Sequence, residues 1–166
     1  EKYRLLWDNI APWHQLNKMS AHLAELNTNI VAASYTYCMG SIEGEIDLYN
    51  YDGIDPLRYL ARTQNFSVCP HGLELRFQSM KKSIASMEID GVIFASNRSC
   101  KVYSLMQMDL LKRTTDNLGV PAVMIDIDHA DARKYTEENV FLRVEALLEL
   151  IDAKRNALAR AHRNEG

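Results

Sequence analysis

The sequence predicts an α/β fold in which a parallel sheet is covered by helices on both faces. Short, strand-like apolar runs alternate along the chain with longer segments whose apolar residues recur at helical spacing. Several of these runs have an unbroken apolar centre, which is typical of strands that are buried on both faces. At 166 residues, the chain is expected to form a single α/β domain over residues 1–166.

The first elements lie before residue 36. Residues 4–7 predict a short strand, and Pro12 is well placed in the first turn of a helix that extends to about Asn27. The second strand is expected over residues 29–35. The helix carries an apolar stripe of Leu16, Met19, Leu23 and Leu26.

The middle of the chain is less regular. Residues 38–55 contain three glycines and five acidic residues, which predicts a long irregular insertion of the kind that is usually functional or mobile. Pro56 favours the start of a short helix, and Pro70 precedes a longer one that ends at Asp90-Gly91. The apolar positions of the longer helix are Leu73, Leu75, Phe77, Met80, Ile84 and Met87.

The last part of the chain predicts two strands and two helices. The third strand is expected over residues 92–96 and the fourth over residues 122–127. Between them, Ser104 is a plausible N-cap of a helix that Gly119 ends. A final helix follows Thr136, and we expect it to fray beyond Asp152. Its buried side is predicted to hold Phe141, Val144, Leu147, Leu148 and Ile151.

Right-handed crossovers leave few ways to arrange these strands. We predict the flavodoxin-like order 2-1-3-4, a three-layer sandwich with a four-stranded parallel sheet. Ligands of such sheets bind beyond the carboxyl ends of the strands, where the strand order reverses. That point lies between strands one and three, so Asp8-Asn9 and residues 97–100 are expected to meet there.

Composition excludes several classes of partner. The formal net charge of −3 gives no reason to expect nucleic acid, and no apolar run approaches the ~20 residues of a membrane span. Cys38, Cys69 and Cys100 are too few and too widely spaced for a disulfide framework, and there is no secretory signal, so we expect a cytoplasmic location. The chain starts on a strand pattern, which suggests part of a longer polypeptide.

Cys100 is the candidate reactive residue. It follows the third strand, where an open parallel sheet places ligands. Arg98 and Lys101 flank it, and positive charge favours the thiolate, the form that binds iron or attacks an electrophile. The alternative is an inert loop cysteine.

Asn97 and Ser99 are expected to turn hydrogen-bonding groups towards whatever Cys100 holds, or else to cap the turn between strand and helix. Arg98 is suited to a phosphate or carboxylate of a substrate, with simple solvation as the alternative.

Aromatic residues are expected near the same crevice. Trp13-His14 opens the first helix, while Tyr35 and Tyr37 end the second strand. Tyr or His there can donate a proton or a hydrogen bond, although packing with one polar edge in solvent is the simpler interpretation.

An acidic cluster follows the fourth strand. It is able to hold a divalent ion, although such residues more often cap loops and helices. The cluster consists of Asp126, Asp128, His129 and Asp131. Cys38 and Cys69 have no signature, and we interpret both as structural.

Three stretches of the sequence resemble one family. Residues 90–105, with Asn-Arg-Ser-Cys at positions 97–100, are similar to the C-terminal domain of 2-hydroxyacyl-CoA dehydratase subunits and of the related benzoyl-CoA reductase subunits. Residues 4–13, with Trp-Asp-x-Ile-Ala-Pro-Trp, and residues 119–135, with Gly-Val-Pro and Asp-x-Asp, resemble the same family.

The resemblance implies a heterodimeric enzyme that works on acyl-CoA thioesters. Each subunit of the family has a homologous partner, and an ATP-hydrolysing activator protein passes an electron to a 4Fe-4S cluster. The thioester is then reduced to a ketyl radical, and in the dehydratases the hydroxyl leaves as water. Cys100 matches one cluster ligand of the family, with catalytic roles for Ser99 and Asn97 nearby.

The resemblance implies that the remaining cluster cysteines belong to a further domain, which we expect outside these 166 residues, and Cys38 and Cys69 do not match their positions. We therefore expect the isolated chain to be cluster-free and inactive. Trp13, Tyr37 and Arg98 are the expected substrate-binding residues, by position only. The alternative function is a non-catalytic flavodoxin-like module for assembly or ligand binding. A flavin site is a weaker alternative, because the loop after the first strand lacks a phosphate-binding cradle.

Overall fold

Four parallel strands form one sheet in the part of the chain that the structure describes. The structure is a computed structural model that describes residues 1–37, 53, 55–64 and 72–164. The strands are β1 (Tyr3–Asp8), β2 (Thr28–Ala33), β3 (Gly91–Asn97) and β4 (Ala122–Ile127). Their order is β2-β1-β3-β4, and every neighbouring pair is parallel. The predicted flavodoxin-like α/β arrangement is therefore confirmed.

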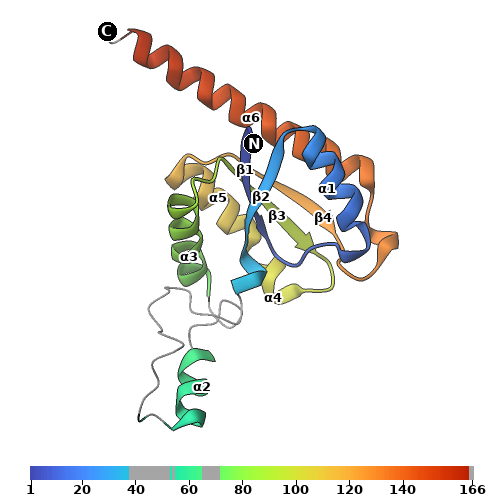
Figure 1. Cartoon of the computed structure of the whole chain (residues 1–166), viewed down its shortest axis with the longest axis vertical. Helices are drawn as coiled ribbons and strands as arrows, with labels where there is room; N and C mark the ends of the chain where they lie inside the picture. Colours follow the sequence, from blue (N-terminus) through green and yellow to red (C-terminus); the bar gives the residue numbers. More distant parts are fainter. Residues whose placement is uncertain (38–52, 54, 65–71, 165–166) are drawn as a thin grey trace.

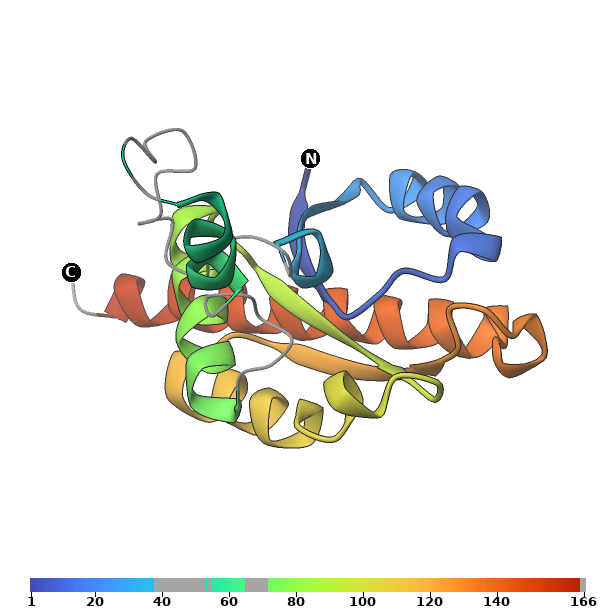
Figure 2. The same ribbon diagram turned by 90° about the horizontal axis from the view of Figure 1, so that it is seen from below.

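Helices cover both faces of the sheet (Figures 1 and 2). Side chains of α1 (Leu16–Glu25) and α6 (Glu137–Asn164) pack on one face. Side chains of α3 (Leu73–Ser86) and α5 (Gln107–Leu118) pack on the other. The remaining described elements are η1 (Trp13–Gln15), η2 (Ser34–Tyr37), α2 (Pro56–Gln64), α4 (Lys101–Ser104) and η3 (Ala132–Lys134).

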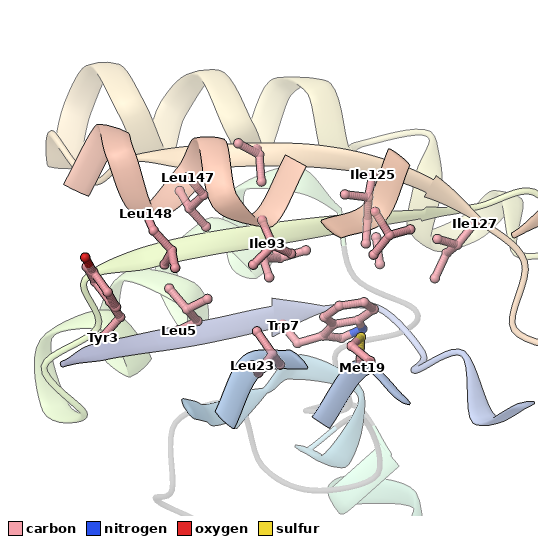
Figure 3. Packing of buried hydrophobic residues seen from close by; sticks show 14 of the residues in the cluster. Tyr3, Leu5, Trp7, Met19, Leu23, Ile93, Ile125, Ile127, Leu147 and Leu148 are labelled. Atoms are coloured by element: carbon pink, nitrogen blue, oxygen red, sulfur yellow. The ribbon is translucent and has the colours of Figure 1, made fainter. Parts of the chain in front are cut away.

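Strand β3 contributes to both cores. Its Ile93 packs with β1, β4 and α6 on one face, as Figure 3 shows, whereas Phe94 packs on the opposite face. Both side chains are completely buried. Successive strand residues point to opposite faces, so burial on both sides requires an unbroken apolar run. This is the pattern from which the third strand was predicted.

Two glycines meet specific backbone demands. Gly119 ends α5 with φ of 61°, the left-handed conformation that favours glycine at a helix C-terminus. Gly91 begins β3, and a Cβ atom there would lie 2.9 Å from Ile151 Cδ1 of α6. The predicted helix stop at Gly119 is confirmed.

The structure corrects one helix start. Ser104 does not cap a helix, because its hydroxyl donates to the carbonyl of Asn97 at 2.8 Å. The helical segment instead begins three residues earlier, at Lys101, and a separate helix starts at Gln107. The expectation of one helix that begins at Ser104 is wrong, because the serine bonds back to the strand end.

The C-terminal helix also differs from its prediction. Instead of fraying beyond Asp152, α6 continues to Asn164. The carboxylate of Asp152 accepts from Tyr3 at 2.7 Å, and Arg155 pairs with Asp90 at 2.7 Å. These contacts join the helix to the start of β1 and to the residues before β3, so the polar segment is anchored rather than free.

Strand β2 has one extra residue where it pairs with β1. Leu5 pairs with Ile30 but Leu6 pairs with Ala32, so Val31 is an extra residue in a β-bulge. Val31 and Ala32 consequently pack on the same face of the sheet. The strand ends at Ala33, and Tyr35, which was expected in the strand, lies in η2.

Most of the predicted insertion at 38–55, together with Cys38 and Cys69, lies outside the described residues. No helix among the described residues combines the length and the apolar character that crossing a membrane requires.

Candidate functional site

The carboxyl ends of β1 and β3 meet, as the predicted strand order requires. Asn9 follows β1 and is completely buried. Its side-chain amide donates to the carbonyl of Ala95 in β3 at 2.9 Å. Its backbone has φ of 93°, which is rare for a residue other than glycine and tends to occur at functional sites. The turn after β1 is therefore fixed against β3.

A buried polar network surrounds Asp8 at this point. Arg76 of α3 donates to both carboxylate oxygens at 3.3 and 3.4 Å, and Gln107 of α5 donates to one of them at 2.8 Å. Ser34 donates from the third side at 2.7 Å. The side chains of Arg76 and Asp8 are only 3% and 1% exposed. A buried carboxylate needs such partners, because an unpaired buried charge is strongly unfavourable.

Sequence reasoning missed Arg76 and Gln107 as members of this network. For Arg76 a signal was present, because it lies next to Phe77 and four residues before Met80, on the buried side of α3. Leu75, which was predicted on that side, is only partly buried. Gln107 gave no signal, because a glutamine in a polar helix is indistinguishable from a surface residue until its neighbours are known.

Arg76 also reaches the turn that follows β3. Its guanidinium donates to the carbonyl of Tyr103 at 3.1 Å and lies 4.1 Å from the centre of the Tyr103 ring. Tyr103 is buried within α4. One arginine thus connects the end of β1 with the short helix directly after Cys100.

Cys100 lies at the N-cap position of α4. Its N–H donates to the carbonyl of Asn97 and its carbonyl accepts from the N–H of Ser104, both at 3.1 Å. The residue is partly exposed and its thiol is free. Its backbone is held at both ends, while its sulfur is not part of either hydrophobic core.

Asn97 and Ser99 are brought together with the loop after β4. The Asn97 carboxamide accepts from the N–H of Ser99 at 3.1 Å and donates to Nδ1 of His129. The Ser99 hydroxyl donates to the carboxylate of Asp128. Their side chains therefore organise the loops at the ends of β3 and β4, which fits the capping interpretation of both residues.

Asp128 is the electrostatic centre of this loop pair. Its carboxylate accepts from Ser99 and from the N–H groups of Ala130 and Asp131, at 2.9 and 3.0 Å for the two amides. These hydrogen bonds, the Ser99 bond first, lower the pKa of Asp128 from 3.8 to about 2. The carboxylate is consequently ionised at neutral pH.

His14 joins the same group from the segment after β1. Its Nε2 lies 3.1 Å from the carbonyl of Asp128, and its ring meets Tyr135 edge to face at 5.7 Å. Burial raises the pKa of Tyr135 to about 12. His14 showed no partner in the sequence, and the structure supplies one.

The acidic cluster is engaged in hydrogen bonds. Asp126 pairs with Arg98, Asp131 pairs with Arg133, and Asp128 caps its own loop. Within the described ranges, no group of three or more His, Cys, Asp or Glu side chains is arranged to hold a metal ion. The contacts of Asp128 and Asp131 agree with the capping interpretation, whereas Asp126 forms an ion pair instead.

Comparison with known proteins identifies the family. A family model described as 2-hydroxyglutaryl-CoA dehydratase, D-component, matches residues 1–151. The chain belongs to this family. The resemblance noted in the sequence is therefore confirmed over most of its length.

Curated relatives of this dehydratase-family chain are enzyme subunits. It is 29% identical over 95% of its length to the (R)-phenyllactyl-CoA dehydratase alpha subunit of Clostridium sporogenes. It is 27% identical over 97% of its length to a benzoyl-CoA reductase subunit of Thauera aromatica. It spans 36% and 37% of the lengths of these two relatives.

A 4Fe-4S cluster is ordinarily held by four cysteine thiolates. Among the residues that the structure describes, the dehydratase-family chain offers Cys100 alone. Those residues therefore do not fit a complete cluster site, whereas the free, partly exposed thiol fits one ligand of a site shared with other residues.

Of the three expected substrate-binding residues, Arg98 and Trp13 interact with different partners. Arg98 is paired with Asp126, an interaction that lowers the pKa of the Asp126 carboxyl. Trp13 is 53% exposed and meets Tyr35 edge to face at 5.7 Å. Tyr37 ends η2, and only its backbone is described. Trp13 at least offers an aromatic surface to solvent in this dehydratase-family chain.

Proposed function

We propose that this chain is the C-terminal domain of a subunit of an iron-sulfur acyl-CoA enzyme. The reaction is the dehydration of an (R)-2-hydroxyacyl-CoA to an enoyl-CoA or the ATP-driven reduction of an aromatic acyl-CoA. The subunit works with a second homologous subunit and an ATP-dependent activator protein. The family membership and the names of the relatives support this proposal.

Cys100 supplies one ligand of the 4Fe-4S cluster in this proposal. The observation that carries it is the position of a free, partly exposed thiol on a turn whose backbone is fixed at the carboxyl end of β3. Parallel sheets place their ligands at that end. When bound, the cluster supplies electrons of low potential, and the remaining ligands come from outside the described residues.

Asn97 and Ser99 position this turn in the proposed site. Each bonds across to the loop after β4, so the Cys100 turn and that loop hold one geometry. The hydroxyl of Ser99 donates its proton to ionised Asp128. Ser99 Oγ can therefore form a further hydrogen bond only as an acceptor, through its lone pairs. Trp13, Tyr37 and Arg98 border the acyl-CoA crevice in the proposal.

The decisive variant is Cys100→Ser in the complete subunit, purified with its partner subunit. We expect loss of bound iron and acid-labile sulfide together with loss of acyl-CoA turnover. Cys38→Ser and Cys69→Ser are the matched controls, and both retain cluster and activity if these cysteines are structural. Full activity of Cys100→Ser would instead support a non-catalytic flavodoxin-like module.

The isolated chain provides a second test. One thiolate does not replace the set of cysteines that such clusters use. We expect residues 1–166, purified without oxygen, to contain far less than one cluster per chain by iron and sulfide assay. A near-stoichiometric cluster on this chain would show that its own residues complete the site.

A further inference from the structure

We propose that the outer edge of β4 binds an extended acidic polypeptide segment as an additional strand. Strand β4 lies at the end of the described sheet, with β3 on one side. A groove of about 1320 Å³ runs along its other side, between α5 and α6. The groove reaches the Cys100 turn through Arg98 alone, and strand addition along β4 does not depend on the proposed enzyme function.

On this side, the backbone groups of β4 have no strand partner among the residues that the structure describes. The backbone N–H of Val92 donates to the carbonyl of Pro121 at 3.0 Å, and the backbone N–H of Arg98 donates to the carbonyl of Ile127 at 3.1 Å. Alternate residues of a strand bond to the same neighbour, so the backbone N–H and C=O groups of the odd-numbered residues of β4 point towards β3. The N–H and C=O groups of Ala122, Met124 and Asp126 consequently face the groove.

The two helices extend apolar surface past this edge. From α5, Met108 is 64% exposed and lines the groove beside Leu111. From α6, Leu142 is 65% exposed and lines it together with Ala146 and Leu150. Apolar walls above and below an open strand edge are what an inserted strand needs, because both of its faces become buried.

The charges that line the groove favour an acidic segment. Arg98, Arg133, Lys134 and Arg143 line it, against Asp126 as its acidic lining residue, although the whole chain has a net charge of −3. Arg98 pairs with Asp126 and Arg133 with Asp131. Lys134 acts on Asp126 through its charge, but neither Lys134 nor Arg143 has a carboxylate of a described residue within 4 Å. An extended segment with carboxylates complements these two cations.

A second copy of this chain is a poorer occupant. A symmetric pair of β4 edges would bring Lys134 and Arg143 of both copies to one interface, where like charges oppose association.

The test uses the purified chain and a synthetic peptide, acetyl-Val-Thr-Val-Val-Glu-Asp-Glu-amide. Residue-resolved hydrogen exchange should slow at the amides of Ala122, Met124 and Asp126, by about tenfold when the site is nine-tenths occupied. A peptide with Lys in place of the three acidic residues should not protect them. Absence of protection by the acidic peptide, or equal protection by both, would overturn the proposal.

Two alternately N-methylated forms of the acidic peptide test for strand pairing. Only one edge of the bound strand faces β4, so methylation of that edge should abolish protection and methylation of the other should preserve it. Equal effects of the two forms would contradict strand addition. Protection that appears without peptide as the chain is concentrated would show that a second copy occupies the edge.

Charge reversal tests the cationic lining. The double variant Lys134→Glu/Arg143→Glu should weaken binding of the acidic peptide roughly tenfold, which is about 1.4 kcal/mol. The double variant Lys154→Glu/Arg160→Glu makes the same change in net charge on the helix of Arg143 but outside the groove, and it should bind like the unaltered chain. Equal weakening by both variants would mean that net charge alone attracts the peptide, and that would overturn the proposed site.

Discussion

The Arg76 guanidinium lies 3.3 Å from the carboxylate of Asp8, and both side chains are almost completely buried. The same guanidinium donates to the carbonyl of Tyr103. Two segments that are far apart in the sequence, the end of β1 and the turn after Cys100, are therefore held by one side chain of α3. The placement of the candidate site depends on this connection.

Arg76→Met tests the connection. The variant leaves the Asp8 carboxylate buried without its cation, which should lower the free energy of unfolding by about 3 to 5 kcal/mol. Urea unfolding of the purified chain measures the change. Adding Asp8→Asn to Arg76→Met should recover part of the loss, because a neutral amide costs less to bury than an unpaired charge.

The control for that experiment is Glu74→Gln, on the same helix. Glu74 pairs with Arg113 at the surface, and exposed pairs contribute little to stability. We expect an unfolding curve that overlays that of the unaltered chain. A loss at Glu74 as large as that at Arg76 would mean that burial is not the cause.

Gly119→Ala tests the end of α5. Nothing lies within 4 Å of a Cβ atom at this position, so the substitution adds backbone strain at φ of 61° without a clash. We expect a loss of about 1 kcal/mol, measured as a lower Tm. Gly119→Asn should lose less, because asparagine adopts the left-handed conformation more readily.

Gly91→Ala tests the close approach of β3 and α6. The new methyl group would lie 2.9 Å from Ile151 Cδ1 and 3.1 Å from Leu147 Cδ1. Overpacking of this kind costs about 1 kcal/mol or more in the free energy of unfolding. Ile151→Val in the same chain removes the nearest carbon and should restore most of the loss in urea unfolding. Additive losses in the double variant would contradict the contact.

The pH dependence of stability tests Asp128. Its pKa is lowered to about 2, so folding favours the ionised form. The stabilisation is present above the ordinary pKa of 3.8 and is lost as the pH falls towards about 2. Unfolding between pH 2 and 5 should therefore depend less steeply on pH in Asp128→Asn than in the unaltered chain. Parallel curves would show that this carboxyl is not perturbed.

The exposure of the Cys100 thiol can be measured by chemical modification. In a chain with Cys38→Ser and Cys69→Ser, Cys100 is the remaining thiol. Because Cys100 is partly exposed, we expect Ellman's reagent to titrate about one thiol per folded chain within minutes. Reaction only after addition of denaturant would mean that the sulfur is buried, and Cys100 would then be a poor ligand for a shared cluster.

Patterning in the sequence predicted the strands well. The fourth strand has the predicted boundaries, residues 122–127, and Val144, Leu147 and Ile151 lie on the buried side of α6 as expected. Strands buried on both faces and a long amphipathic helix leave periodic signals that are independent of tertiary detail.

The elements that the sequence misplaced depend on long-range bonds. Ser104 has the chemistry of an N-cap, but its hydroxyl bonds to the end of β3 instead. Asn97 and Ser99 were predicted to share the site, whereas their partners His129 and Asp128 follow a different strand and were grouped with a possible metal site. Such pairings become visible only when the strands are side by side.

The extra residue at Val31 fixes where Ser34 arrives. Without the bulge, Ser34 would shift by one position along β1 and turn towards the opposite layer, away from Asp8. Deleting Val31 would thus regularise the ladder and at the same time remove a hydroxyl from the carboxylate. The number of residues between 28 and 34 is therefore constrained as strictly as the identity of their side chains. Insertion or deletion of one residue there should be tolerated far less than in a surface loop.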